Sequence, residues 1–270
     1  RRSANKLIEE FMLLANETVA EHFYWMETPF VYRVHEKPAA DKIEQLRIFL
    51  KGFGITLRGN ADGIHPKAIC SVLDSAKGKP GEDVVNSVTL RSMQKAFYST
   101  SCEGHFGLAL KYYCHFTSPI RRYPDLMIHR IIKQSIHEGL SDKALKHFRK
   151  KAEYAADQSS IAERKAVEAE REVEKLKKAE YISYHVGEIF DGVISGVTGF
   201  GIYVQLENTV EGLVRIDELR DDYYDYHKEK YALEGRRTGN VYRLGDEVRV
   251  IVDHVDLEKR EIDFLIAGHL

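Results

Sequence analysis

The stretch 192-GVISGVTGFGIYVQL-206 decides the fold of the last third of the chain. It holds short runs of β-branched and aromatic residues between glycines, which is typical of strands joined by tight turns. Similar runs occur on both sides of it. Together they predict five short strands, at residues 188–194, 201–206, 212–216, 247–255 and 261–266.

One long polar connection interrupts these strands, and this spacing predicts a five-stranded OB barrel over residues 184–270. The connection includes 221-DDYYDYHKEKYALEGRRTG-239. Asp221, Asp222 and Asp225 offer carboxylates to Mg²⁺, but we favour a solvated acidic loop because carboxylates without a rigid frame rarely make a metal site.

Phe200 and Tyr203 are three residues apart across a glycine, which places both rings near one face where a strand begins. Exposed rings of this kind stack on unpaired bases and contribute about 1–3 kcal/mol per base. Aromatic residues are more often buried, so the alternative is that both rings belong to the barrel core. Arg215, His254 and Arg260 would add phosphate or stacking contacts to an exposed pair.

The chain before the barrel reads as mostly helical. Ser3 is a candidate N-cap for a helix to residue 27, whose wide apolar arc predicts that it is mostly buried. We expect a strand at residues 105–116, which are rich in aromatic residues. Further helices are predicted at 38–51, 66–76, 83–97 and 118–137.

A single helical pattern extends from residue 141 to about 182. The positions that define the pattern recur at steps of three and four, and half of them are alanine. Small residues predict a helix that lies close against its own domain, whereas a coiled coil prefers larger aliphatic residues. Coiled-coil dimerisation is the alternative, and the oligomeric state stays undetermined.

The segment 115-HFTSPIRRYPDLMIHR-130 carries the densest chemistry. Arg121 and Arg122 lie at a turn that enters a helix, where free backbone N–H groups favour anions. A guanidinium there can bind phosphate through two hydrogen bonds. Alternatively, one of the arginines pairs with Asp125 or with a buried glutamate.

The amino-acid composition limits where the protein can reside in the cell and how it could bind RNA. The 270 residues include 40 basic and 42 acidic side chains, so an RNA-binding surface would have to gather its positive charge locally. The three cysteines share no close pair, which argues against a disulfide scaffold or a zinc site. We find no membrane span or signal peptide and expect a cytoplasmic protein.

The last 87 residues, 184–270, resemble the S-one type RNA-binding domain. The resemblance rests on 192–206, GLVRI at 212–216, GDEVRV at 245–250 and VDLEKREIDF at 255–264. It implies RNA-facing positions for Phe200, Tyr203, Arg215, Asp256 and Arg260. Many members of that family have histidine where Arg215 stands, and arginine can equally stack or meet phosphate.

Residues 1–183 resemble the second half of the catalytic domain in the ribonuclease II and ribonuclease R (RNB) family, and the ribonuclease R branch more closely. The motifs are LIEEFMLLANETVAEHF at 7–23, VYRVHEKP at 31–38, residues 105–130, and AERKAVEAEREV at 162–173. The implied fold class is α+β, a mostly helical half-domain followed by an all-β barrel.

That family implies 3′-to-5′ hydrolysis of single-stranded RNA to nucleoside 5′-monophosphates with Mg²⁺. Arg121 would hold the scissile phosphate, Glu10 would contact the terminal nucleotide, and Arg122 and Glu170 would bind RNA. Glu10 and Glu170 could instead be ordinary helix-surface carboxylates. His105 and His115 are expected to be structural.

The family's metal-binding aspartates have Asp-x-Asp-Asp spacing, and residues 1–183 contain no such cluster. We therefore expect Mg²⁺ to serve the parent enzyme through ligands outside this chain, in a missing amino-terminal half. The chain alone should bind RNA and cut it poorly or not at all. A non-catalytic RNA-binding adaptor and a structural assembly piece are the alternatives.

Overall fold

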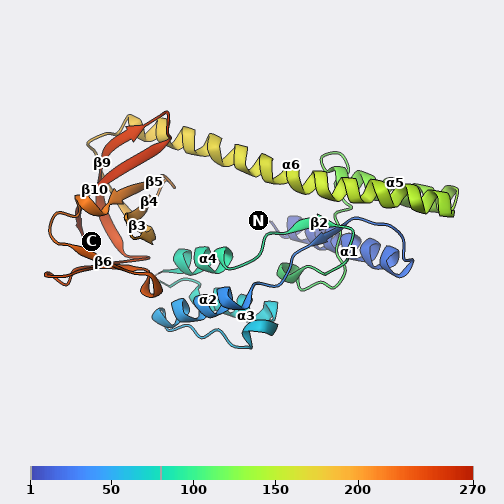
Figure 1. The fold of residues 1–270 in the computed structure, drawn as a ribbon, viewed down its shortest axis with the longest axis horizontal. Helices are drawn as coiled ribbons and strands as arrows, with labels where there is room; N and C mark the ends of the chain where they lie inside the picture. The colour runs from blue at the N-terminus through green and yellow to red at the C-terminus, as the bar shows by residue number, and fades with distance from the viewer. Residues whose placement is uncertain (1, 80, 270) are drawn as a thin grey trace. The chain divides into compact units, whose positions relative to one another are not determined.

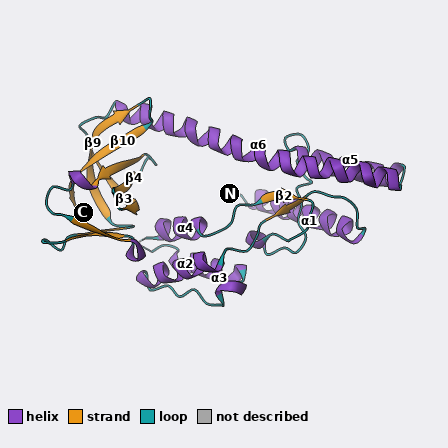
Figure 2. Ribbon diagram, in the orientation of Figure 1, coloured by secondary structure: helices purple, strands orange, loops and turns teal. Residues whose placement is uncertain are grey.

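A computed structural model describes residues 2–79 and 81–269 (Figure 1). The chain divides into two compact units. The first comprises residues 1–40, 59–68 and 93–167, and the second comprises residues 41–58, 69–92 and 168–270. Helices and strands are both present, as Figure 2 shows, so the α+β prediction is confirmed.

The first unit packs three helices around a small two-stranded sheet, whose strands come from distant parts of the sequence. Its helices are α1 (Ser3–Trp25), α5 (Tyr123–His137) and the first part of α6 (Asp142–Ser183). Strand β1 (Tyr32–Val34) pairs antiparallel with β2 (Phe97–Ser99), and two 3-10 turns, η1 (Ala61–Gly63) and η2 (Phe106–Leu108), complete the unit. The core gathers fully buried aliphatic and aromatic residues, among them Phe30, Val34, Met127, Ile128, Ile131, Ala152 and Ala155.

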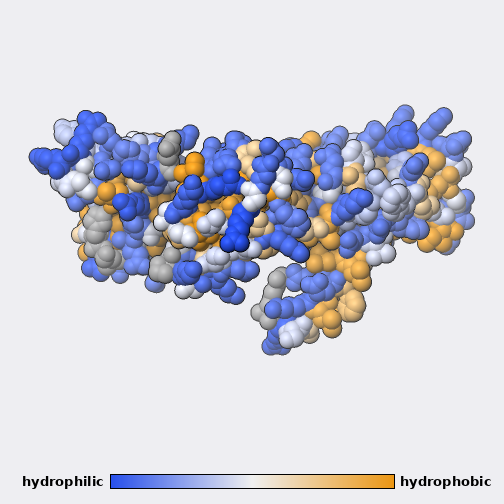
Figure 3. Space-filling model, turned by 90° about the horizontal axis from the view of Figure 1, so that it is seen from below, coloured by the Kyte–Doolittle hydropathy of each residue, from blue (hydrophilic) through white to orange (hydrophobic). Residues whose placement is uncertain are grey.

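Helix α1 differs from its prediction at both ends and on its surface. Arg2 occupies the N-cap position, without a side-chain capping bond, and Ser3 is the first helical residue. The only buried residues of the helix are Asn16, Ala20 and Phe23. Its first half exposes its apolar arc, with more than half of each side chain accessible at Leu7, Ile8, Phe11 and Leu14. The prediction of a mostly buried helix is therefore wrong, and hydrophobic residues also reach the surface in Figure 3.

Residues 105–116 do not form the predicted strand. They form η2 and an irregular segment, with isolated bridges at His105. Ala109 has φ 57°, which ends the 3-10 turn. Three consecutive side chains, Tyr112, Tyr113 and Cys114, are all buried, whereas a strand with one buried face alternates. The aromatic residues of this segment are thus core residues of a loop.

The second unit contains α2 (Ala40–Gly52), α3 (Pro66–Ala76) and α4 (Glu82–Arg91). Bounds of α2 and α3 agree with the predicted 38–51 and 66–76 to within two residues. Helix α4 ends six residues before the predicted residue 97. Tertiary pairing overrides the helical pattern there, because Phe97–Ser99 forms β2.

The barrel closes in the strand order β10-β5-β4-β3-β9. Its strands are β3 (Ile189–Thr198), β4 (Gly201–Leu206), β5 (Glu211–Arg215), β9 (Glu247–Asp256) and β10 (Glu261–His269). Pairing is antiparallel except between β10 and β5. Fully or nearly fully buried side chains fill the interior, including Ile194, Ile202, Val204, Val214, Val248, Val250, Val252 and Phe264. All five predicted strands are present.

The polar connection is a folded sheet and not a solvated loop. It forms β6 (Tyr224–His227), β7 (Ala232–Gly235) and β8 (Val241–Arg243), with 3-10 turns η3 (Ile216–Glu218) and η4 (Lys228–Lys230) before β6 and β7. Asp222 accepts hydrogen bonds from the backbone N–H groups of Arg237 and Thr238, and these bonds hold its pKa below the usual range. Asp225 pairs with Arg236 at 2.7 Å. The carboxylates therefore stabilise the sheet.

Helix α6 extends over 42 residues, close to the predicted span. Phe148, Ala152 and Ala155 are buried near its start, and Ala179 and Ile182 near its end. Its middle, around Ala162–Val173, is mostly exposed, and the boundary between the two units falls there. Among the described residues, no helix combines the length and apolar character that crossing a membrane requires.

Candidate nucleic-acid interface

Asn16, a buried polar residue of α1, fixes the segment that leads into the arginine turn. Its Oδ1 accepts hydrogen bonds from the backbone N–H of Phe116 at 2.9 Å and of Thr117 at 3.3 Å. Its Nδ2 donates to the Tyr113 hydroxyl at 3.3 Å. The side chain is 3% exposed, so these bonds satisfy polar groups that water does not reach.

The turn itself is held by a buried ion pair. Arg122 Nε donates to Asp125 Oδ1 at 2.7 Å and to Oδ2 at 3.0 Å, and the Asp125 side chain is fully buried. Asp125 Oδ2 also accepts the backbone N–H of Ser118 at 3.3 Å. The alternative in which one arginine pairs with Asp125 therefore applies to Arg122, and helix α5 begins directly after it at Tyr123.

Arg121 differs from its neighbour. Its side chain is exposed, and across residues 2–79 and 81–269 no hydrogen bond or ion pair from its guanidinium is found. Only its backbone N–H is engaged, with the Ser118 carbonyl at 3.3 Å. The turn thus presents one free guanidinium on a backbone fixed by Asn16 and Asp125.

Arg33 and Arg122 both lie close to His115, and each of them is paired with a carboxylate. Arg33 pairs bidentately with Glu163, at 2.6 and 2.9 Å, and its guanidinium lies 4.6 Å from the centre of the Tyr98 ring. The Tyr98 hydroxyl is hydrogen-bonded to His115 Nδ1 at 2.9 Å. Burial, and then the positive charges of Arg122 and Arg33, lower the pKa of His115 to about 3.

His105 behaves in the same way, because burial and the nearby His35 and Arg33 lower its pKa to about 4. Both histidines are therefore neutral near pH 7, and both pack against the Tyr113 ring. An anion that approaches this region meets the unpaired guanidinium of Arg121, because Arg33 and Arg122 are paired with carboxylates.

The two predicted glutamates, Glu10 and Glu170, do not contact the residues of the arginine turn. Glu10 is exposed on α1, six residues before Asn16, which is about 9 Å along a helix axis. Glu170 is exposed in the middle of α6. For neither side chain does the described part of the chain show a partner, and their predicted roles stay predictions.

On the barrel, four predicted residues line one groove of about 520 Å³: Phe200, Tyr203, Arg215 and Arg260. The Phe200 ring is 55% exposed and meets the Tyr203 ring edge to face, with centroids 6.2 Å apart. Both rings are therefore available at a surface. Lys175 and Lys178 of α6 line the same groove and add positive charge that the motif alone did not indicate.

Carboxylates orient the two groove arginines. Arg215 lies 3.3 Å from Asp263 and remains 54% exposed, while Arg260 is hydrogen-bonded to Glu172. Asp256 lies at the adjoining turn, where it accepts the backbone N–H groups of Glu258 and Lys259 at 3.0 Å each. In this structure Asp256 therefore shapes the turn, and its contact with RNA stays a prediction.

Within the described residues, no group of three or more histidine, cysteine or acidic side chains is arranged to hold a metal ion. Two carboxylates near the arginine turn form ion pairs, Asp125 with Arg122 and Glu163 with Arg33. These residues do not fit a Mg²⁺ centre.

Family comparisons agree with this geometry. Residues 1–138 match the RNB domain, and residues 183–267 match the S1 RNA binding domain. The chain belongs to the RNB family. Within that family, ribonuclease R 1 of Lactococcus lactis is 48% identical over 265 residues, which are 98% of this chain and 32% of that protein.

Solved structures of RNB proteins share the fold. The apo form of Mycoplasma genitalium RNase R superposes with a TM-score of 0.91 at 32% identity, over 98% of this chain and 42% of that one. The same enzyme in complex with ribose methylated single-stranded RNA gives a TM-score of 0.90 with the same coverage. The chain thus spans between about a third and two fifths of the relatives that it matches.

The sequence analysis missed the buried and paired residues that position the arginine turn and its surroundings. Asn16 is the one polar residue that α1 buries, and a lone asparagine within an apolar arc could have indicated this role. The pairing of Arg33 with Glu163 joins residues 130 apart, and no local signal marks it.

Proposed function

We propose that this chain supplies the phosphate-contacting and strand-capturing parts of a hydrolytic exoribonuclease, which shortens single-stranded RNA from its 3′ end and releases nucleoside 5′-monophosphates. The observation that carries the proposal is the free, exposed guanidinium of Arg121 beside Arg122, whose own guanidinium pairs with the buried Asp125. A preorganised donor of this kind stabilises negative charge that develops on phosphate.

Family membership and the RNA-bound Mycoplasma genitalium relative support the choice of RNA as the ligand. The barrel groove supports a second contact with the same strand, because exposed rings beside cations bind unpaired nucleotides without sequence preference. The free thiols of Cys70, Cys102 and Cys114 support a reducing, cytoplasmic location as part of the proposal.

Mg²⁺ is part of the proposed reaction, where it would activate water and neutralise phosphate charge. Since the described residues do not fit a metal centre, the proposal takes its ligands from residues outside this sequence. The 270-residue chain should then bind RNA with little or no cleavage. Release of mononucleotides from a labelled oligonucleotide by the purified chain with Mg²⁺ would contradict this part.

The deciding test is Arg121→Ala in a longer protein that contains these residues and degrades RNA. Turnover should fall roughly 100- to 1,000-fold, as when one preorganised donor is removed, while RNA affinity stays nearly unchanged. Single-turnover cleavage and equilibrium binding, measured on the same oligonucleotide, separate the two quantities.

Arg130→Ala removes an equal charge from an exposed position on α5 and serves as the control. It should leave turnover within about twofold. Equal losses of affinity and turnover at Arg121 would make it a binding residue only, and the function would then be that of a non-catalytic RNA-binding adaptor.

A further inference from the structure

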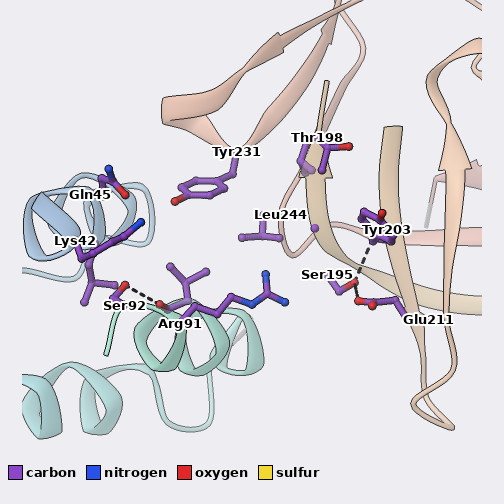
Figure 4. Close-up of a pocket in the computed structure, with 14 residues that line it drawn as sticks. Lys42, Gln45, Arg91, Ser92, Ser195, Thr198, Tyr203, Glu211, Tyr231 and Leu244 are labelled. Atoms are coloured by element: carbon purple, nitrogen blue, oxygen red, sulfur yellow. Dashed lines mark hydrogen bonds between the residues drawn. The ribbon is translucent and has the colours of Figure 1, made fainter. Parts of the chain in front are cut away.

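A second cavity of about 360 Å³ opens beside the barrel groove, within the second unit. Its walls come from α2, α4 and the barrel with its added sheet (Figure 4). Lys42 and Gln45 line it from α2, Arg91 lines it from α4, and Tyr231 and Tyr203 line it from the β region. The volume lies within the range of small-molecule pockets.

The helical wall is positive. Lys42 and Arg91 extend from their helices into the cavity, and both side chains are exposed (Figure 4). Among the described residues, neither side chain has a hydrogen-bond or ion-pair partner. The one carboxylate of the lining, Glu211, accepts a hydrogen bond from Ser195 on the barrel side. Two cations from different helices thus face one space whose lining contains a single carboxylate.

An aromatic ring faces the same space. Tyr231 is half-buried, and its ring meets that of Phe49 edge to face, with centroids 5.4 Å apart. This contact holds the ring in place and leaves part of it toward the cavity (Figure 4). A positioned tyrosine beside two cations is the combination that binds a nucleotide, with the base on the ring and the phosphate on the cations.

Tyr203 connects the two sites, because it lines both this cavity and the barrel groove. A neighbouring cavity of about 870 Å³ has the opposite character. Its lining contains Arg91 together with five carboxylates, those of Asp83, Asp191, Glu207, Glu211 and Glu247. A polyanion leaving the groove is therefore attracted past Tyr203 toward Lys42 and repelled from the acidic side.

We propose that this cavity is a nucleotide subsite for the RNA strand that the barrel groove holds. Lys42 and Arg91 contact a phosphate of that strand, and the base of the same nucleotide lies against Tyr231. The proposal rests on the proposed RNA-binding function and extends it to helices α2 and α4, so that RNA is held by residues of both the helical segment and the barrel.

The test is RNA binding by the 270-residue chain, with an unstructured uridine oligonucleotide of about 12 nucleotides, measured across a salt series. Lys42→Ala with Arg91→Ala should weaken binding roughly tenfold and reduce the slope of log affinity against log salt by about 0.7, the value for one lost phosphate contact on a single strand. Lys51→Ala with Lys77→Ala, two exposed lysines outside the cavity, is the charge-matched control and should change neither quantity.

A thiouridine-bearing oligonucleotide gives a readout that needs no variant. Irradiation should crosslink it to the peptide that contains Tyr231, and mass spectrometry identifies that peptide. Crosslinks restricted to the barrel groove, together with equal affinities of the double variant and its control, would overturn the subsite.

The same series separates this proposal from the function on which it depends. If Phe200→Ala with Tyr203→Ala weakens binding while Lys42→Ala with Arg91→Ala acts like the control, only the subsite fails. If the unaltered chain does not bind the oligonucleotide at all, the RNA-binding function and the subsite both fail.

Discussion

The arginine turn and the barrel groove use similar residues in opposite settings. At the turn, Arg122 pairs with a fully buried Asp125 at 2.7 Å. In the groove, Arg215 lies 3.3 Å from Asp263 and stays 54% exposed. The rings differ in the same way, since Tyr98 is 7% exposed and Phe200 is 55% exposed.

Burial decides what each arrangement is suited for. A buried, fully paired network holds one geometry, because breaking it leaves an uncompensated charge in a low dielectric. Exposed rings and screened ion pairs can adjust to successive nucleotides at little cost. We infer that the turn fixes one phosphate, and that the groove accepts a strand without fixing its register.

The largest difference between the two regions should appear when each loses its carboxylate. Asp125→Ala should lower the free energy of unfolding of the first unit by about 3–5 kcal/mol, because it leaves Arg122 unpaired in a buried site. The single tryptophan, Trp25, lies in α1 of that unit, so its fluorescence in a urea titration reports the change.

Asp263→Ala is the matched variant in the groove and should cost at most about 1 kcal/mol, since its partner is half exposed. Circular dichroism follows its unfolding, because the barrel contains no tryptophan. Similar losses for both variants would remove the contrast between a fixed turn and an adaptable groove.

The next effect concerns capture of the strand. Phe200→Ala with Tyr203→Ala should weaken binding of a long single strand roughly 5- to 100-fold, because each base loses a stacking partner. Cleavage of strands that are already bound should change much less in a longer, active protein. Tyr154→Ala, which alters an exposed ring on α6, is the control. Unaltered affinity would show that the groove rings do not contact RNA.

How far sequence predicts structure differs between the same two regions. All five barrel strands follow from local patterns, because each alternates inward and outward residues between glycines. Gly201, with φ 151°, shows why a glycine marks the start of a strand reliably here. A side chain at this position would clash with the Val214 carbonyl oxygen. The aromatic pair of the groove is equally local, since Phe200 and Tyr203 are three residues apart, whereas Lys175 and Lys178 come from α6.

In the first unit, long-range contacts decide the structure. The buried triplet at Tyr112, Tyr113 and Cys114 has the composition of a strand, yet Asn16, nearly 100 residues earlier, holds the loop that follows. Arg121 and Arg122 are adjacent in sequence, but only Arg122 pairs with Asp125, while the guanidinium of Arg121 stays free. A motif can therefore identify such a pair without showing which member is free.

The last predicted effect is a dependence on pH between about 5 and 6.5, which arises from the buried histidines of the first unit. His115 has a pKa of about 3 in the folded chain and about 6.5 when unfolded. As pH falls below 6.5, the unfolded chain binds a proton that the folded chain does not, so His115 stabilises the fold above that pH and progressively less below it. Between pH 6.5 and about 5 this should cost about 1–2 kcal/mol. His115→Gln should roughly halve the pH dependence of Trp25-detected unfolding, because His105, with a pKa of about 4, contributes a similar slope. His137→Gln, at an exposed position of α5, should leave the pH dependence unchanged. An equal slope in both variants would mean that buried His115 does not contribute to the acid sensitivity of the first unit.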